Sequence, residues 1–190
     1  MKKVLALITH GVEEIEAVTP FDLLRRAGVE VTVSALGAGA DLVVRGRGGI
    51  ALLADAAFET LAGTPEDFGA LAEKFDALMI PGGPGSFALR EDGRAARLAA
   101  AFAAKGKIVA AICAAPLILK DAGLLEGRRV SAHFCAWEEI PAANNCARTE
   151  LDGNVLTSRG PGTAFDFGLA LAELLAGKSA AAKVAAETMS

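Results

Sequence analysis

The chain has 190 residues, of which 53% are hydrophobic and 22% are charged, a composition typical of a compact α/β enzyme. A net charge of −4 offers no basic surface to nucleic acid or anionic lipid, and three cysteines are too few for a disulfide framework. No apolar run reaches the ~18 residues of a membrane span, and the apolar stretch that begins at Val4 ends at Ile8, too early for a secretory signal. We therefore expect one domain over residues 1–190, located in the reducing cytoplasm.

Short β-rich runs alternate with helical stretches along the whole chain. The predicted strands cover 4–8, 29–35, a short pair at 42–44 and 50–53, then 77–80, 108–112, a strand beginning at Val130, and 155–158. The predicted helices cover 13–27, 94–105, 114–122 and 163–176, and the residues after Lys178 either form a final helix or fray. This alternation predicts a mostly parallel sheet covered on both faces, with ligands bound at the carboxyl ends of the strands.

A thiol stands at the end of one predicted strand, in the run IVAAICAAP. A nucleophile elbow is a sharp strand-to-helix turn that needs small residues two positions before and two positions after the nucleophile. Ala111 and Ala115 fill these positions around Cys113, and the start of the next predicted helix would favour the thiolate. Free cysteine is also among the most buried residue types, so the local pattern leaves a reactive and an inert Cys113 both open. Cys135 and Cys146 lack this setting and are predicted to be ordinary thiols.

Acidic residues of the first predicted helix are candidate partners for the thiol. On a helical wheel Glu13 and Glu16 project toward the apolar side, where a carboxylate is costly unless it is paired or protonated. Glu14 projects to the opposite, solvated side with Asp22 and Arg25. Acids in a first turn also complement the helix dipole, so periodicity narrows the choice to Glu13 and Glu16 without selecting one.

One histidine and one glycine-rich turn complete the candidates. His133 follows the predicted strand beginning at Val130, near a strand's carboxyl end and within reach of the sulfur, whereas His10 is predicted to be an ordinary loop residue. The PGGPGS turn follows a strand and lets backbone N–H groups approach a ligand, as an oxyanion hole requires. An ordinary turn can have the same composition, so the motif alone does not distinguish an oxyanion hole from a turn without function.

Several segments, taken together and in this order, resemble the ThiJ/PfpI superfamily in the branch of the parkinsonism-associated deglycase and its bacterial relatives. They are EEIEAVTPFDLLRRAGVEVTV near the start, LADA at 53–56, MIPGG at 79–83, AAICAAP at 110–116 and LTSRGPGTAFDFGLALAELLAGK at 156–178. The resemblance implies an α/β, flavodoxin-like three-layer sandwich, with a mostly parallel sheet, helices on both faces, and a homodimer.

The resemblance also implies a set of site residues: Cys113 as the nucleophile, Glu16 as the buried acid, His133 as the histidine near the thiol, and Gly83 and Ala114 as the oxyanion-binding amides. The chain departs from the family pattern in HFCAWEEIPAAN, where the family commonly has His-Pro, and the RGRGGI segment carries an extra glycine, so Arg47 is assigned no role. Ala114 replaces the histidine of the protease-like branch, and no late H-x-E pair of the glutamine amidotransferases follows.

These assignments imply a cofactor-independent cysteine enzyme that acts on reactive dicarbonyls. Its reaction would be that of a glutathione-independent glyoxalase, methylglyoxal to lactate, extending to early glycation adducts. We expect a small carbonyl substrate, no cofactor or metal, and no nucleic-acid or membrane partner. The same residues would serve an oxidative-stress sensor or protective chaperone that acts through oxidation of Cys113 without turnover, and the sequence does not separate the two.

Overall fold

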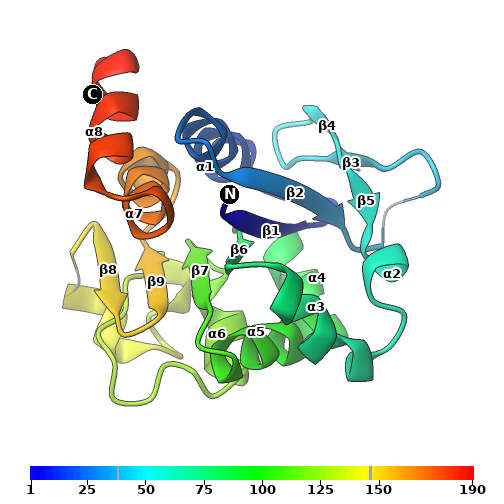
Figure 1. Cartoon of the computed structure of the whole chain (residues 1–190). Helices are drawn as coiled ribbons and strands as arrows, with labels where there is room; N and C mark the ends of the chain where they lie inside the picture. Colours follow the sequence, from blue (N-terminus) through cyan, green and yellow to red (C-terminus); the bar gives the residue numbers. More distant parts are fainter. Residues whose placement is uncertain (38, 146) are drawn as a thin grey trace.

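A seven-stranded sheet forms the centre of the computed structural model, which describes residues 1–37, 39–145 and 147–190 (Figure 1). In spatial order its strands are β5 (Ala56–Ala57), β2 (Glu30–Ala35), β1 (Lys3–Ile8), β6 (Ala77–Ile80), β7 (Ile108–Ile112), β9 (Val155–Ser158) and β8 (Thr149–Asp152). All neighbouring strands are parallel except β8, which runs antiparallel to β9. The strands β3 (Val43–Arg45) and β4 (Ala51–Leu53) form a separate antiparallel hairpin.

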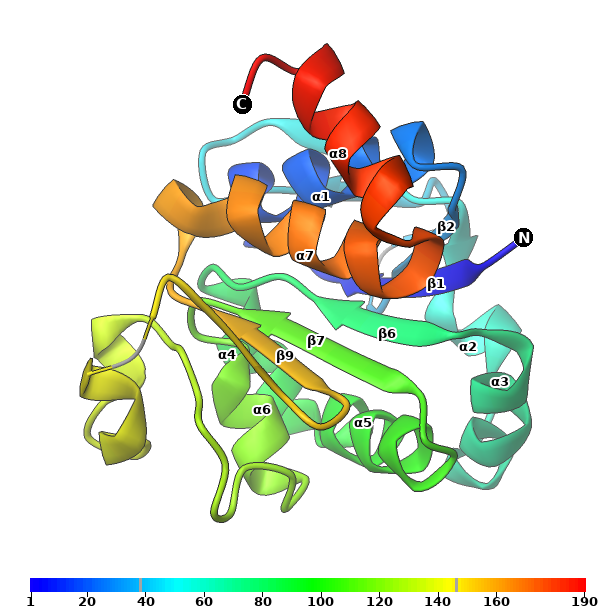
Figure 2. The ribbon, with the colours of Figure 1, turned by 60° about the vertical axis from the view of Figure 1, so that its left-hand side comes forward.

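Helices cover both faces of the sheet, which confirms the predicted flavodoxin-like sandwich (Figures 1 and 2). One face carries α1 (Glu14–Arg26), α7 (Ala164–Ala176) and α8 (Lys178–Glu187). The other carries α2 (Phe58–Leu61), α3 (Phe68–Lys74), α4 (Gly85–Asp92), α5 (Arg94–Ala104) and α6 (Pro116–Asp121). Short 3₁₀ turns lie at Pro65–Asp67, Phe134–Ala136, Pro141–Asn145 and Pro161–Thr163. No helix among the described residues is long and apolar enough to span a membrane.

The strands are buried because their alternate side chains enter two different cores. In β1, Val4, Ala6 and Ile8 pack with α1 and α7, whereas Leu5 and Leu7 pack with the helices of the opposite face. All five side chains are fully buried. A parallel sheet with both faces covered requires this kind of continuous apolar strand, so the runs in the sequence had indicated the right architecture.

Several stretches differ from the predicted elements, among them the segment at Val130 and the strand β8. The strand predicted to begin at Val130 does not form, because β9 already pairs with β7 on one edge and with β8 on the other. Residues 130–132 instead run irregularly beside β9, where the Ser131 N–H donates to Thr157 Oγ1 at 2.9 Å. The hairpin strand β8 was not predicted; its turn uses Gly153 in the left-handed region, with φ of 61°. The residues after Lys178 form the helix α8 rather than fraying.

The sheet order brings the loops that follow β6 and β7 to one edge of the sheet. Strand β1 lies between β2 and β6, so the chain turns to opposite sides of β1, and such a switch point leaves a crevice at the carboxyl ends of the strands. The segment after β6 contains PGGPGS, and the segment after β7 begins at Cys113. The predicted nucleophile and the predicted oxyanion loop therefore meet at this edge.

Candidate active site

Cys113 has the strained backbone of a nucleophile elbow. Its φ is +68°, in the left-handed region, which costs a non-glycine residue on the order of 1–3 kcal/mol. Two hydrogen bonds hold it there: its N–H donates to the Ser158 carbonyl at 3.0 Å, and its carbonyl accepts from the His133 N–H at 2.9 Å. Gly82 lies against it so closely that a Cβ at that position would come within 2.7 Å of the Cys113 Cβ. The fold thus fixes the thiol between the loops that follow β6, β7 and β9.

Glu16 is the acid beside this thiol. It is fully buried on α1, and its Oε2 accepts a hydrogen bond from the Gly82 N–H at 2.9 Å. Its Oε1 lies near the thiol but has no hydrogen-bond partner of good geometry among the described residues. Burial raises the pKa of Glu16 to about 7, and the charge of Glu13 acts in the same direction, while the contacts with Cys113 and Gly82 oppose the rise. The carboxyl therefore gains and loses a proton near neutral pH.

The thiol itself does not titrate as the helix-dipole argument predicts. Burial, followed by the negative charge of Glu16, raises the pKa of Cys113 above its ordinary value, and the Gly83 N–H acts in the opposite direction. The sulfur belongs to a residue only 8% exposed, and α6 is a short helix that begins beyond the elbow at Pro116. Cys113 and Glu16 therefore titrate as a coupled pair in which the thiol keeps its proton at neutral pH, rather than as an independent thiolate.

Gly83 and Ala114, the residues with the predicted oxyanion amides, both lie at the cavity that holds Cys113. Gly83 has φ of 90°, and a Cβ there would run into the Glu13 nitrogen and come within 2.5 Å of the Gly11 carbonyl oxygen, so only glycine fits. The Gly83 N–H points to the Cys113 sulfur. The Ala114 N–H has no hydrogen-bond acceptor among the described residues. That these two amides stabilise a bound oxygen therefore stays a prediction.

His133 completes the predicted group. Its Nδ1 accepts a hydrogen bond from the Cys135 N–H at 3.3 Å, so a neutral ring carries its proton on Nε2. Burial, and then the positive charge of Arg47, lowers the pKa of His133, which keeps the ring neutral at pH 7. A Cβ placed on Gly160 would meet His133 Cδ2 at 3.5 Å, Glu16 Oε1 at 3.8 Å and Cys113 Sγ at 3.9 Å. The three predicted catalytic side chains therefore converge on one point.

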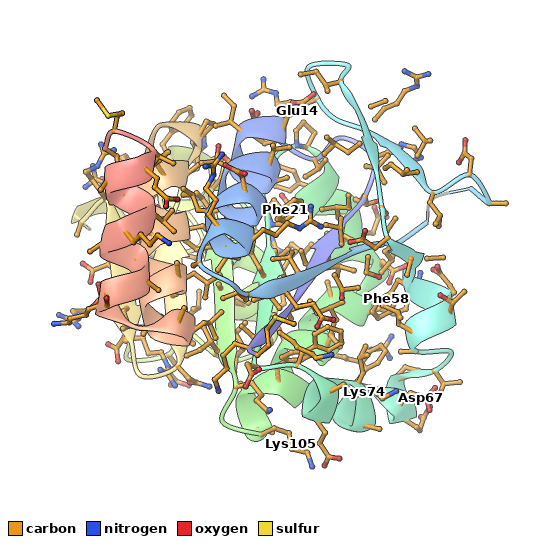
Figure 3. All side chains as sticks on the ribbon, turned by 45° about the horizontal axis from the view of Figure 1, so that its top comes forward. Glu14, Phe21, Phe58, Asp67, Lys74 and Lys105 are labelled. Atoms are coloured by element: carbon orange, nitrogen blue, oxygen red, sulfur yellow. The ribbon has the colours of Figure 1, made fainter. Side chains whose placement is uncertain are left out.

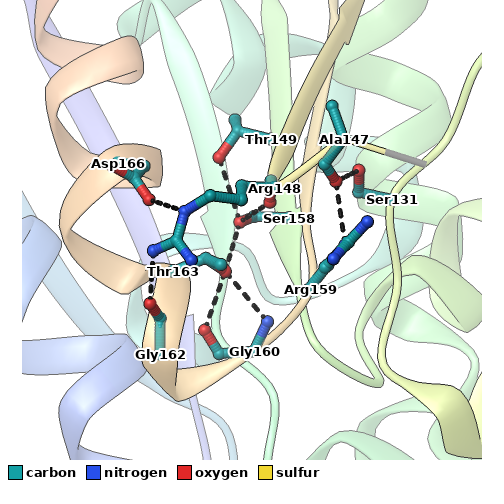
Figure 4. Close-up of polar contacts among 10 residues, drawn as sticks. All are labelled: Ser131, Ala147, Arg148, Thr149, Ser158, Arg159, Gly160, Gly162, Thr163 and Asp166. Carbon is teal, nitrogen blue, oxygen red and sulfur yellow. Dashed lines mark hydrogen bonds and ion pairs between the residues drawn. The ribbon is translucent and has the colours of Figure 1, made fainter.

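The Gly160 loop is held in place by a polar network at the end of β9 (Figure 4). The Ser158 and Thr163 hydroxyls lie 2.7 Å apart, and the Gly160 N–H donates to Thr163 Oγ1 at 3.1 Å. Arg148 joins this loop to α7, since it donates to Asp166 Oδ2 at 2.7 Å and to the Gly162 carbonyl at 2.7 Å. The network thereby fixes the Gly160–Pro161 segment, which forms one wall of the site.

A cavity of about 200 Å³ opens over these groups. Its lining residues are Glu13, Glu16, Arg47, Gly83, Pro84, Phe87, Cys113, Ala114, His133, Cys135 and Pro161. Arg47 was assigned no role and Cys135 was predicted to be an ordinary thiol, yet both face this cavity. Arg47 Nη1 pairs with Glu13 Oε2 at 3.2 Å, which satisfies the second candidate acid and leaves Glu16 as the one beside the sulfur. The helical periodicity of a single segment cannot show that Arg47 and Cys135 face this cavity.

The prediction that Glu14 is solvated is wrong. The loop of the β3–β4 hairpin folds over the start of α1, so Glu14 is only 8% exposed (Figure 3). Its Oε1 accepts from the Gly48 N–H at 2.7 Å and from the Ile50 N–H at 3.3 Å. Hydrogen bonds from backbone N–H groups lower its pKa, so this carboxyl stays ionised and anchors the hairpin. His10 is a loop residue outside the cavity; its Nδ1 accepts from the Arg45 N–H at 3.1 Å.

The remaining candidates do not assemble into a second centre. No three His, Cys, Asp or Glu side chains gather as metal ligands would within the part of the chain that the structure describes. Cys146, predicted to be an ordinary thiol, lies outside the described residues.

Comparison with known proteins places this site in a family. A model of the DJ-1/PfpI family matches residues 2–174. The chain is 35% identical over 190 residues to protein dj-1beta of Drosophila melanogaster, covering 97% of this chain and 95% of that protein. It is 33% identical over 163 residues to a protein of Pyrococcus abyssi named a deglycase, covering 84% and 91%. The solved structure of oxidized DJ-1 from Toxoplasma gondii superimposes with a TM-score of 0.85 at 35% identity, covering 100% of this chain and 98% of that one. The chain belongs to the DJ-1/PfpI family.

Proposed function

We propose that this protein is a cofactor-independent cysteine enzyme that converts methylglyoxal and related dicarbonyls to hydroxy acids. The observation that carries the proposal is the Cys113 thiol in an elbow conformation beside a fully buried carboxyl whose pKa is about 7. A carboxyl tuned to neutral pH is suited to both accept and donate a proton within one reaction. The match to a relative named a deglycase is consistent with carbonyl chemistry at the same site.

The first step would form a hemithioacetal. Ionised Glu16 takes the thiol proton of Cys113 while the sulfur attacks the aldehyde carbon of the substrate. A C–S bond forms, and the electron pair of the C=O bond moves to the oxygen. The Gly83 and Ala114 N–H groups would stabilise this developing negative charge before Glu16 returns the proton to the oxygen and becomes ionised again.

The second step would move hydrogen between the two substrate carbons. Glu16, ionised again, removes the proton from the carbon bound to sulfur and returns it to the neighbouring carbon. His133 Nε2–H donates its proton to the oxygen on the neighbouring carbon and regains one from the hydroxyl on the carbon bound to sulfur, which becomes the thioester carbonyl. The product on the enzyme is a thioester of the 2-hydroxy acid, formed without external oxidant or reductant. Water then cleaves the C–S bond, releases lactate and restores the thiol.

Lactate formation from methylglyoxal tests this proposal directly. We expect turnover by the wild-type protein, no turnover by Cys113→Ser, and a loss of roughly 10²–10⁴-fold in kcat for Glu16→Gln, the range associated with removal of a general acid–base. Glu91→Gln, which changes an exposed glutamate on α4, should retain the wild-type rate and controls for the change of charge. Absence of lactate with the wild-type protein would refute the proposal.

The unpartnered Oε1 of Glu16 favours a second candidate function, an oxidative-stress sensor without turnover. A protonated Glu16 would donate a hydrogen bond to an oxygen of oxidised Cys113, which would stabilise the sulfinic acid. The similar DJ-1 protein of Toxoplasma gondii is described as oxidized in its solved structure. This candidate would be supported over the enzyme if mass spectrometry found sulfinic acid at Cys113 after peroxide treatment and the protein formed no lactate from methylglyoxal.

A further inference from the structure

A second thiol faces the catalytic cavity. Cys135 is exposed and lines the same hollow as Cys113. One residue connects the two: the His133 N–H donates to the Cys113 carbonyl at 2.9 Å, and His133 Nδ1 accepts from the Cys135 N–H at 3.3 Å. Cys135 is therefore held close to the elbow by the fold, although the two cysteines are far apart in the sequence.

The segment that carries Cys135 is suited to a small movement. Cys135 lies in the 3₁₀ turn Phe134–Ala136, which follows an irregular stretch, and Phe134 before it is 67% exposed. Such a turn rises about 2 Å per residue, so Cys135 is only a few ångströms along the chain from a residue that touches Cys113. A disulfide needs Cα atoms about 4.4–6.8 Å apart, so the bond requires this exposed turn, which belongs to no strand of the sheet, to bring Cys135 within that range of Cys113.

We propose that Cys135 is the resolving thiol of Cys113, and that the pair forms a reversible intramolecular disulfide when the site meets a hydroperoxide. The Cys113 sulfur attacks the peroxide, takes one oxygen atom to become a sulfenic acid, and the peroxide leaves as water or an alcohol. The Cys135 sulfur, losing its proton, then attacks the sulfenic sulfur, so that an S–S bond forms and water is released. An external dithiol reduces the disulfide and restores both thiols.

The proximity of Cys135 would decide whether oxidised Cys113 forms a disulfide or is oxidised further to sulfinic acid. A neighbouring thiol on the same chain acts at an effective concentration on the order of millimolar or more, above the peroxide concentrations that oxidise a reactive cysteine. The sulfenic acid would therefore be captured as a disulfide before a second peroxide converts it irreversibly to sulfinic acid. The inference rests on a reactive Cys113, as the proposed function does, but not on methylglyoxal being its substrate.

Peroxide titration read by mass spectrometry tests the pair. The reduced full-length protein is treated with hydrogen peroxide, free thiols are alkylated, and the protein is digested with trypsin and a glutamate-specific protease. Cleavage at Lys120 and Glu138 separates Cys113, Cys135 and Cys146 into different peptides. We expect a Cys113–Cys135 cross-link that dithiothreitol removes, both in the wild-type protein and in the matched control Cys146→Ser.

Cys135→Ser should abolish the cross-link and raise the rate of sulfinic acid formation at Cys113 by roughly tenfold, as expected when a thiol at millimolar effective concentration is lost. Cys135→Ala provides the same test without a hydroxyl in the cavity. The proposal is overturned if Cys113 becomes sulfinic acid equally fast in the wild-type protein, or if Cys135 bonds only to Cys146 or to another chain. Failure of the proposed enzyme would appear separately, as absent lactate with an intact cross-link.

Discussion

Glu16 is fully buried, and its negative charge costs folding free energy. Because its pKa is about 7 in the folded protein and about 4.5 ordinarily, the folded state binds the proton more tightly. Stability therefore falls as pH rises from about 4.5 to about 7, and a shift of this size corresponds to about 3 kcal/mol. We expect Glu16→Gln to be more stable than wild type by up to about 3 kcal/mol at pH 8 and little different near pH 4.5.

Urea denaturation at the two pH values measures this difference. Glu91→Gln, at an exposed position, should change stability by the same small amount at both. A Glu16→Gln variant whose stability gain is equal at pH 8 and pH 4.5 would mean that the carboxyl is not protonated by burial. The same variant should also lose most of its turnover. A Glu16→Gln protein that is more stable but less active than wild type would show that the active-site carboxylate lowers the folding stability.

The three glutamates at the start of α1, with Glu13 just before the helix, show which part of the site was predictable. Periodicity placed Glu13 and Glu16 on the buried side, and they are 7% and 0% exposed. It also placed Glu14 in solvent, which was wrong, because a helical wheel describes one helix and not the hairpin that folds over it. The choice between Glu13 and Glu16 depends on Arg47 and Gly82, which reach α1 from other elements. Only the family resemblance could make that choice from the sequence.

At the level of elements, α1 and α7 approach each other closely at a glycine. A Cβ on Gly168 would lie 2.7 Å from Leu23 Cδ1 and 3.1 Å from the Pro20 Cα, in the middle of the core. Alanine improves helix propensity over glycine by about 1 kcal/mol, but overpacking a core costs about 1–3 kcal/mol. We expect Gly168→Ala to lose about 1 kcal/mol of stability and to lower turnover, because displacement of α1 moves Glu16.

The matched control is Gly69→Ala in α3, where nothing lies within 4 Å of the added Cβ. There the propensity acts alone, so we expect a gain of about 0.5–1 kcal/mol in urea denaturation and unchanged turnover. Equal stability gains at both positions would show that the contact between α1 and α7 is looser than the structure indicates.

The helices and strands that the sequence did not predict correctly are short, or they depend on contacts with segments far away in the sequence. Helices α2 and α3 have four and seven residues, too few to establish a 3.6-residue period, and α4 begins inside the glycine-rich turn. The stretch at Val130 runs beside β9, whose two edges are already paired with β7 and β8, and this pairing depends on the order of the whole sheet. The long apolar strands and α1, α5 and α7 were predicted within a few residues because their burial alone determines their pattern.

For the whole molecule, the family resemblance implies a homodimer, and one face has the character of an interface. Ile15 and Val18 on α1 and Ile50 and Leu53 on the hairpin are 53%, 46%, 61% and 73% exposed. Val18 and Leu53 line one hollow of about 330 Å³ between these two elements. Exposed apolar side chains gathered on one face are the kind of surface that an isologous two-fold contact between copies of the chain would bury.

We expect Leu53→Glu to convert the dimer to a monomer, because two carboxylates would be buried around the two-fold axis without partners. Sedimentation velocity over a range of protein concentrations measures the change. Leu174→Glu alters an exposed leucine on α7, which is not part of this face, and should remain dimeric. Since Arg47 and Glu13 belong to the same hairpin and helix, the monomer should also have a higher KM. A wild-type protein that sediments as a monomer at all concentrations would rule out this interface.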